Sequence, residues 1–589
     1  MTVSWDLGDL ISDAGRDDPP RAVDVLLAEA ARLTGVFAAR FTGALAELDG
    51  PGLVGAMRAL AEIRELTTRA ATYADLSFAV DTADPARGAL RQHVVERRTA
   101  IDKDLLFFRL EWAALDDARA GELLAADGLG FARHHLRTLR RDRPHLLTEP
   151  EERILAEKAV SGRAAWVRLH EERTAAIEVA LDDGPASLET ALARLSSAGR
   201  EVRRDTAERV TAALEPGIRT RAYAFNMLLA DKASDDRLRG HPHWLSARNL
   251  ANEASDASVE ALLDAVRRRH ELPRRWYRLK AELLGLDRLA DYDRTAAVAG
   301  DQEDIPWADA RDLVNETYAD FSPELGAIVR RFHDERWIDA PVRPAKRGGA
   351  FCAYATPGVH PYIMLNYTHT TADVLTLAHE LGHGVHGALA ARQGIFHMAT
   401  PLTLAETASV FGETLVFHRL LERASTPESR LSLLARSIEG SIKTVFRQVA
   451  LNRFEHLAHT GRREEGELSV ERLGDLWTGS QREMFGDSVE LTGGYRHWWS
   501  YIPHFVSTPG YVYAYAYGQL LALAVYARYE EEGPAFVPRY LDLLGAGGSR
   551  GPEELGRMVG VDLADPTFWD RGLDLVERRL DEAETAARA

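Results

Sequence analysis

The stretch TADVLTLAHELGHGVHGALA, residues 371–390, constrains the fold more than any other part of the chain. Its apolar residues recur at helical spacing and cover most sides of the helix that they predict. They are Val374, Leu375, Leu377, Ala378, Leu381, Val385 and Leu389. A helix that is apolar all round is buried, so we expect other elements to enclose it. It also carries histidines and a glutamate, and buried groups of this kind need partners.

His379, Glu380 and His383 form the pattern H-E-x-x-H within this helix. Four residues are about one helical turn, so the two imidazoles project from one face and can share one Zn²⁺. Glu380 is rotated away from them, where it can reach a water at the metal and act as a general base. The alternative, two surface histidines on an amphipathic helix, conflicts with the apolar surroundings. The pattern predicts a zinc site with one Zn²⁺ per chain.

A catalytic zinc site needs a third protein ligand and one open position. Residues 400–417, TPLTLAETASVFGETLVF, offer Glu406 on a second helix, which Thr400 can cap and Pro401 can begin. In the alternative, Glu406 is the capping-box partner of Thr403, and the helix begins later. That alternative leaves Pro401 without a role. We therefore predict Glu406 as the third ligand.

Two further residues are predicted to support the metal ligands. Glu413 shares a helix face with Glu406 and is expected to accept a hydrogen bond from a ligand histidine. His386 lies seven residues after His379 on the same stripe. We predict that it orients a ligand or packs, and we favour this over a role as a metal ligand. The longer metzincin pattern is excluded, because it requires Gly at 386 and His at 389.

The segment HFVSTPGYVYAYAYG, residues 504–518, raises a separate question. It holds tyrosines at every second position: Tyr511, Tyr513, Tyr515 and Tyr517. As a strand it points all four rings to one face. As a helix it pairs the first with the third and the second with the fourth. The rings either pack in the core or present neutral hydrogen-bond donors to a reacting group.

Composition and net charge limit the kinds of binding partner that the chain can have. The net charge of −18 argues against a nucleic-acid partner, since phosphate binding needs a basic face. Cys352 is the single cysteine, so no intrachain disulfide is possible, and no motif marks it as a nucleophile. Phe505–Ala527 is uncharged, but its Ser, Thr, Pro and Gly residues argue against a membrane span. The acidic N-terminus lacks a signal-peptide pattern, so we expect a cytoplasmic protein. No feature predicts an oligomeric state.

The rest of the chain is mainly helical by periodicity. One β-hairpin is expected in GAFCAYATPGVHPYIMLNYT, residues 349–368, around a turn at Thr356-Pro357-Gly358. A break between helices at residues 182–187 and a second one at 343–350 suggest three regions. These are an N-terminal helical lobe (1–185), a helical region completing a channel wall (186–340) and a zinc-peptidase region (341–589).

Four stretches together carry a family resemblance: LTEPEERILAEK, GAFCAYATPGVHPYIMLNY, TLAHELGHGVHG followed by LTLAETASVFGE, and HFVSTPGYVYAYAYG. The chain resembles zinc metallopeptidases of the oligoendopeptidase F branch of the thimet oligopeptidase family. The resemblance implies a mainly α, two-lobed body with a deep channel, zinc at its floor, and cleavage of short peptides at internal bonds. It places the ligands on His379, His383 and Glu406, and the base on Glu380.

The resemblance also implies substrate contacts. The hairpin falls where such enzymes bind the peptide backbone as an added strand, with Tyr362 as a contact. The tyrosine segment falls where the family places transition-state donors, although relatives have a glycine between the last two tyrosines. We expect His504, Tyr511 and Tyr515 to donate to the substrate and Tyr513 and Tyr517 to pack, with Tyr513 also a candidate for substrate contact.

Two other functions compete with an endopeptidase. A zinc exopeptidase of the helical carboxypeptidase type would need a basic residue for the terminal carboxylate, and the segment after the tyrosines offers only Arg528. A non-catalytic metal-binding or peptide-binding scaffold would show a degraded site. The site is whole in this sequence, which favours the enzyme.

Overall fold

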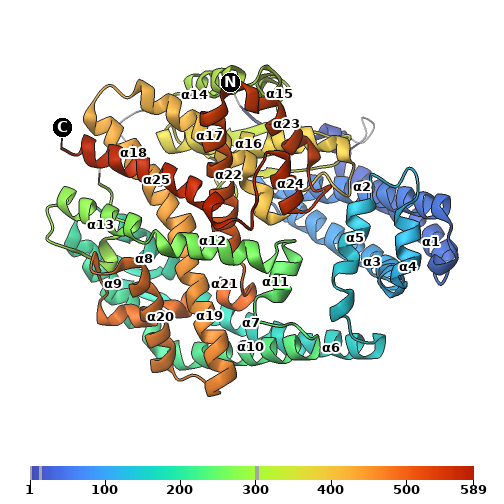
Figure 1. The fold of residues 1–589 in the computed structure, drawn as a ribbon, viewed down its shortest axis with the longest axis horizontal. Coiled ribbons are helices and arrows are strands. Elements are labelled where there is room, and N and C mark those ends of the chain that lie inside the picture. The colour runs from blue at the N-terminus through green and yellow to red at the C-terminus, as the bar shows by residue number, and fades with distance from the viewer. Residues whose placement is uncertain (1–2, 12–15, 299–303, 589) are drawn as a thin grey trace. The chain divides into compact units, whose positions relative to one another are not determined.

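A computed structural model of the chain describes residues 3–11, 16–298 and 304–588. Helices dominate it, which confirms the predicted mainly α fold class (Figure 1). The chain divides into two compact units, each assembled from three segments. Unit 1 holds Met1–Arg143, Glu303–Arg419 and Arg528–Val561; unit 2 holds Pro144–Gln302, Leu420–Ala527 and Asp562–Ala589. The predicted regions 1–185, 186–340 and 341–589 follow chain order instead and stay a prediction.

Unit 1 begins with three long helices that pack on one another (Figure 1). Each begins after an aspartate whose carboxylate accepts a backbone N–H of the first turn, followed by a proline in that turn. The helices of unit 1 are α1 (Pro19–Phe41), α2 (Gly50–Ala79), α3 (Pro85–Ala114), α4 (Asp117–Leu124), α5 (Arg133–Arg141), α14 (Trp307–Phe321), α15 (Pro323–Asp334), α16 (Thr371–Ala390), α17 (Leu402–Arg423, which continues into unit 2), α23 (Val537–Ala546) and α24 (Pro552–Met558).

A three-stranded sheet of unit 1 has the order β4 (Ile338–Pro341), β6 (Tyr362–Tyr367), β5 (Phe351–Ala353). The antiparallel pair of β5 and β6 confirms the predicted hairpin, with Phe351 opposite Met364. The parallel partner β4 was not predicted. One face of β6 packs with the N-terminal segment and α2, while α16 also contacts the sheet. Coverage on both faces explains why β6 is almost continuously apolar.

Helix α16 spans the residues that the sequence predicted. Thr370 caps it, and the Asp373 carboxylate accepts the N–H of Thr370 at 3.0 Å in return. Most of its side chains are buried, as expected of a helix that is apolar all round. The zinc pattern therefore lies on an enclosed element, next to the hairpin strands β5 and β6.

Unit 2 has its own core, contributed mainly by residues 177–229 and 451–512. Its helices are α6 (Glu149–Ser161), α7 (Arg163–Ala175), α8 (Leu188–Ala193), α9 (Arg200–Leu214), α10 (Ile218–Leu238), α11 (Ser246–Ala251), α12 (Asp256–Arg268), α13 (Glu271–Leu283), α18 (Pro427–Ser441), α19 (Arg447–Glu465), α20 (Val470–Phe485), α21 (His504–Ser507), α22 (Tyr513–Glu532, ending in unit 1) and α25 (Pro566–Ala586). A π-helical turn, Ile442–Phe446, joins α18 to α19.

The break between helices predicted at residues 182–187 lies between α7 and α8, and it holds a hairpin that the sequence did not predict. β1 (Glu178–Leu181) and β2 (Gly184–Ser187) form an antiparallel hairpin there. Val179 and Leu181 face the core while their neighbours are exposed, the alternation of a half-buried strand. A further short parallel pair joins β3 (Leu289–Ala290) to β7 (Val489–Glu490).

Three of the four tyrosines are helical, since α22 begins at Tyr513, and Tyr511 lies just before it. The rings pair as a helix requires, with the Tyr511 and Tyr515 centroids 5.1 Å apart. Within the described residues, no helix combines the length and the hydropathy that crossing a bilayer demands.

Candidate metal centre

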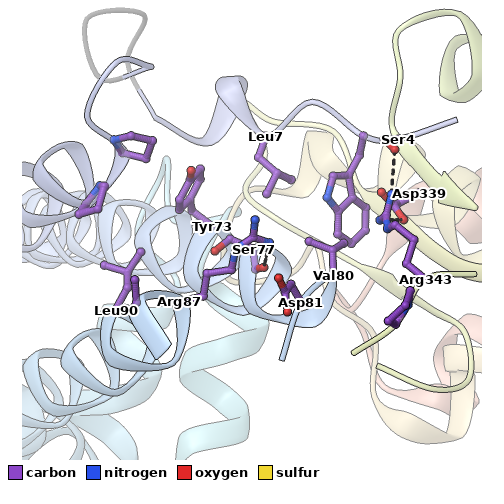
Figure 2. Close-up of a pocket in the computed structure, with 15 residues that line it drawn as sticks. Ser4, Leu7, Tyr73, Ser77, Val80, Asp81, Arg87, Leu90, Asp339 and Arg343 are labelled. Carbon is purple, nitrogen blue, oxygen red and sulfur yellow. Dashed lines mark hydrogen bonds and ion pairs between the residues drawn. The ribbon is translucent and has the colours of Figure 1, made fainter. Parts of the chain in front are cut away.

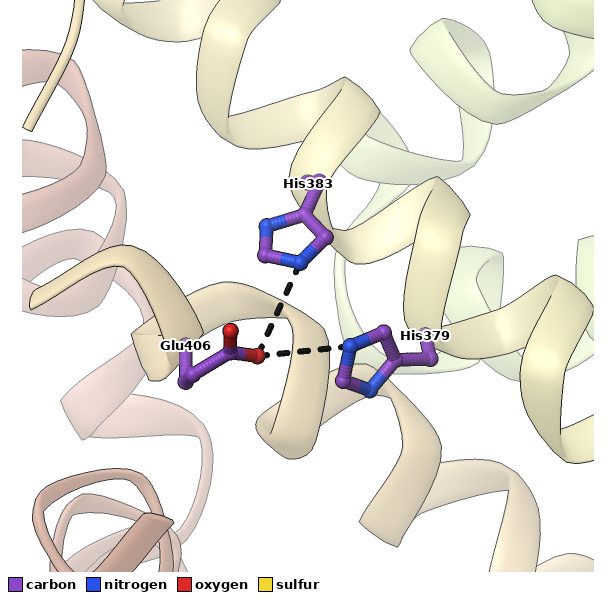
Figure 3. Close-up of side chains that lie close together, drawn as sticks. All are labelled: His379, His383 and Glu406. Carbon is purple, nitrogen blue, oxygen red and sulfur yellow. Dashed lines mark ion pairs between the residues drawn. The ribbon is translucent and has the colours of Figure 1, made fainter. Parts of the chain in front are cut away.

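Helices α16 and α17 bring His379, His383 and Glu406 together, with all three side chains directed at a common point (Figure 3). The Glu406 carboxylate lies 3.3 Å from the Nε2 of His379 and 3.6 Å from the Nε2 of His383. One donor atom from each residue lies within 4.8 Å of the other two. Two imidazole nitrogens and one carboxylate oxygen are a donor set that suits a catalytic Zn²⁺ and leaves a fourth position open.

The start of α17 bears on the two readings of Glu406. The helix begins at Leu402, directly after Pro401 and before Thr403. This start favours the reading in which Pro401 begins the helix, and the role of Glu406 as a ligand stays a prediction. The Ser409 hydroxyl donates to Glu406 at 2.6 Å, which fixes the carboxylate on the side of the histidines. The sequence analysis did not identify Ser409, although a hydroxyl three residues after Glu406 is within reach on a helix.

Gly382 allows the two helices to approach closely enough for Glu406 to reach the histidines. A Cβ atom at this position would lie 2.4 Å from the carbonyl oxygen of Ala408 and 2.5 Å from the Cα of Ser409. These are backbone atoms of α17, which cannot rotate aside. A side chain at 382 would therefore push α17 away from α16.

We expect Gly382→Ala to lower both stability and zinc retention. Overpacking of a close helix contact typically costs about 1–3 kcal/mol, and the displaced Glu406 binds the metal less well. Thermal unfolding and zinc content after dialysis measure the two effects. Gly55→Ala is the matched control, because Gly55 lies in α2 with no atom near its missing Cβ. A Gly382→Ala protein with parental stability and zinc would contradict this interpretation.

Glu413 holds His379 from the other side. Its carboxylate accepts a hydrogen bond from the Nδ1 of His379 at 3.0 Å, which leaves the Nε2 directed at Glu406. Burial lowers the pKa of His379, but the contacts with Glu406 and Glu413 outweigh burial and hold that pKa well above its usual value. A carboxylate at the far nitrogen fixes the tautomer and raises the basicity of a metal-binding histidine.

Glu380 is buried, and its Oε2 has no hydrogen-bond partner among the described residues. Burial raises the pKa of its carboxyl to about 7, with a further contribution from Glu406 opposed by His379. A carboxyl in this condition can both take and release a proton near neutral pH. A hydrogen bond with the backbone of Cys352 opposes this rise in pKa, which places strand β5 close to the Glu380 carboxyl.

His386 and Tyr354 lie near these residues, and only His386 was predicted to take part in the site. His386 is buried, its Nδ1 has no partner within the described part of the chain, and burial lowers its pKa to about 3. Its role stays a prediction. Tyr354, which was not predicted from the sequence, packs its ring against Gly387. Burial raises the pKa of its hydroxyl well above the usual value, and Cys352, Glu406 and Glu380 raise it further.

The side chains of Tyr362 and Tyr513 are fully buried. Tyr362 packs edge-on against Trp5 in the core behind the sheet, and the hydroxyl of Tyr513 accepts a hydrogen bond from the Nδ2 of Asn252 at 2.9 Å within unit 2. Neither ring has surface left for a substrate. Their burial therefore does not support the predicted substrate contacts, and Tyr517 is as fully buried as Tyr513.

His504, Tyr511 and Tyr515 of the same segment are only partly buried. The Nε2 of His504 lies 3.3 Å from the hydroxyl of Tyr515, and its ring stacks on that of Tyr511 with a centroid distance of 6.1 Å. Burial lowers the pKa of His504, and Arg447 adds to this effect. The three predicted donors thus form one cluster in unit 2 with accessible polar atoms.

A cavity of about 750 Å³ lies elsewhere in unit 1, between the N-terminal segment, α2, the start of α3 and β4 (Figure 2). Trp5, Tyr73, Arg87 and Arg343 are among its walls, and none of the predicted site residues lines it. Its size alone does not make it the catalytic centre, because it lacks the convergent donors of the histidine cluster.

Comparisons with known proteins point in one direction. The profile of peptidase family M3 matches residues 193–575, and that of oligopeptidase F matches residues 111–178. Oligopeptidase PepF of Bacillus subtilis is 26% identical over 532 residues, which cover 89% of this chain and 79% of that protein. Group B oligopeptidase PepB of Streptococcus agalactiae is 27% identical over 466 residues, which cover 77% and 76%.

Solved structures share the fold. A Chlamydophila abortus crystal structure superposes with a TM-score of 0.88 over 99% of this chain and 98% of that one, at 22% identity. The oligoendopeptidase-F of Enterococcus faecium superposes with a TM-score of 0.71 over 98% and 99%, also at 22% identity.

Proposed function

The chain belongs to peptidase family M3 and is a metallopeptidase, and we propose that it hydrolyses internal bonds of short peptides with one Zn²⁺ held by His379, His383 and Glu406. The resemblance to the oligoendopeptidase F branch is confirmed. The observation that carries the proposal is the convergence of these three donors from two helices, with Glu380 on the same turn of α16 and its Oε2 without a hydrogen-bond partner among the described residues.

A Zn²⁺ in this position would act as a Lewis acid that polarises the carbonyl of the scissile bond. Glu380 takes the proton of the attacking water and delivers it to the leaving amine. Glu413 and Ser409 hold His379 and Glu406 in place through their hydrogen bonds. Glu406, Ser409 and Glu413 all belong to α17. This helix therefore supplies one ligand and also orients His379.

His504, Tyr511 and Tyr515 are proposed to donate hydrogen bonds to the substrate as charge develops on its carbonyl oxygen. A neutral phenol suits this role because it brings no charge that must lose its water shell. The partial exposure of the two rings and their contact with His504 support the assignment. The buried Tyr513 and Tyr517 support the cluster by packing.

Tyr511→Phe and Tyr515→Phe are each expected to lower kcat about 10²–10³-fold, the usual effect of losing one preorganised donor. Zinc content and thermal stability should stay near those of the parent, because Phe keeps the ring. Tyr517→Phe is the matched control and should turn over like the parent. If both test variants also do so, the donors lie elsewhere.

An exopeptidase is the second candidate, and the environment of Arg528 does not favour it. Its guanidinium already donates to Glu532 and to the carbonyl of Gly560. It is therefore engaged and not available for a terminal carboxylate. No other basic residue lies in the segment GQLLALAVYARYEEEG that follows the tyrosines.

Peptides with both ends blocked separate the two functions. Acetylated and amidated peptides of about ten residues should be cut at internal bonds as fast as their free counterparts, as read by mass spectrometry. Removal of single residues from free ends, with blocked peptides left intact, would establish the exopeptidase instead.

A further inference from the structure

Residues 504–515, here called the donor segment, carry His504, Tyr511 and Tyr515. The Ser-Thr-Pro-Gly turn inside it suggests, from sequence, a backbone that is free to aim these side chains. The structure shows the reverse: two arginines and a buried glutamate from three other helices of unit 2 bind the backbone of the turn.

Three contacts fix the turn. Arg163, at the start of α7, donates to the carbonyl of Ser507 at 2.9 Å. Arg248 of α11 donates to the carbonyl of Pro509 at 3.3 Å. The N–H of Gly510 donates to the Oε1 of Glu455 on α19 at 2.7 Å. Residues 507–510, which separate His504 from the two tyrosines, are thus bound to three separate helices.

Glu455 is the unusual member of this set. Its side chain is 0% exposed, and its Oε2 has no partner among the residues that the structure describes. Burial raises the pKa of its carboxyl to about 8, against the lowering effects of the Gly510 N–H and Arg248. Near neutral pH it is therefore mostly a neutral acid. A buried carboxyl is costly, and the hydrogen bond from Gly510 is the contact that it makes here.

The backbone of Gly510 leaves the turn little room to shift. Its φ of 73° lies in the left-handed region that favours glycine. A Cβ there would lie 2.6 Å from the Cδ1 of Leu245, so the turn rests directly on the residues that precede α11. Tyr511 follows at once, with its ring centroid 6.0 Å from the guanidinium carbon of Arg248. A shift of the turn would therefore move the first phenol.

We propose that Glu455 is a positioning residue for catalysis, which with Arg163 and Arg248 sets the place of His504, Tyr511 and Tyr515. The inference rests on the proposed function, because the donor role of these three residues belongs to it. Displacing a reacting group by about 1 Å can cost about 10²-fold in rate. Holding the turn in place therefore contributes directly to the rate.

Glu455→Ala is expected to lower kcat about 10²-fold, with KM changed by less than about three-fold and zinc content unchanged. Glu455→Gln should restore most of kcat, because the amide oxygen can accept the same N–H and the side chain is neutral like the buried acid. Arg163→Ala should cost about 10-fold. Arg163 is exposed, so this variant tests the turn without emptying a buried position.

Asn226→Ala is the matched control for loss of stability. Asn226 is 1% exposed in unit 2 and ties the backbone of Leu468 through two hydrogen bonds, but it makes no contact with the turn. If Asn226→Ala lowers kcat as much as Glu455→Ala at a similar melting temperature, the effect of Glu455 is only structural. The proposal is then overturned.

A double-mutant cycle separates this proposal from the assignment of the donors. In a Tyr511→Phe/Tyr515→Phe background, Glu455→Ala should cost at most a few-fold more, because two of the three groups that it positions are already missing. Full additivity would overturn the positioning role. If the tyrosine variants turn over like the parent, the donor assignment fails. If they lose activity while Glu455→Ala and Arg163→Ala keep it, only the positioning role fails.

Discussion

Glu380→Gln is expected to keep its zinc and lose nearly all peptide hydrolysis. The amide has the shape of the carboxyl but cannot accept the proton of the attacking water. General base catalysis contributes about 10²–10⁴-fold in rate, so kcat should fall by at least that range. Steady-state hydrolysis of a blocked peptide, with zinc measured on the same sample, gives the result.

The control for this prediction is Glu324→Gln. Glu324 is an exposed residue in the first turn of α15, in the same unit as Glu380. It should behave like the parent protein in both measurements. Cleavage by Glu380→Gln at near the parental rate would assign the base to another residue, and Tyr354 would then be the neighbouring group to test.

Glu406→Ala should lose its zinc on dialysis, and its activity with it. The carboxylate is the one anionic donor of the three convergent groups, and zinc–carboxylate distances of about 2.0–2.2 Å are expected once the metal is bound. Without it, two neutral imidazoles remain. Zinc content after dialysis and hydrolysis of a blocked peptide measure the loss.

Glu413→Ala is the matched comparison, since it removes a carboxylate that touches His379 from the same helix. Loss of such a support typically costs about 10–100-fold in metal affinity or activity, so this variant should still bind zinc at higher concentration. A full zinc complement in Glu406→Ala, with an empty site in Glu413→Ala, would exchange the two roles.

The sequence reveals the histidine pair because both ligands lie within one helical turn. That spacing is local, so the prediction needs no knowledge of the rest of the fold. Glu406 could be predicted from the sequence because Pro401 marks where α17 begins. Gly382 and Ser409 are different: their roles depend on how closely α17 approaches α16, which is a property of tertiary packing and not of spacing.

The β-structure shows the same limit. The strand-favouring residues of β6 next to a turn signal made it predictable, whereas the strands β1 and β2, with four residues each, were not predicted. The burial of Tyr362 was missed because Trp5, far away in sequence, covers it. Likewise, Arg163, Arg248 and Glu455, which bind residues 507–510, come from helices distant in sequence. The sequence of the turn alone therefore suggested a flexible backbone.

The central claim is that one zinc ion at His379, His383 and Glu406 performs the hydrolysis. Titrating zinc into chelator-stripped protein, with hydrolysis of a doubly blocked peptide as the readout, tests it most directly. Activity should be absent at the start, rise in proportion to added zinc and saturate at one zinc per chain. Full activity of the metal-free protein, or a rise that continues well beyond one equivalent, would contradict the claim.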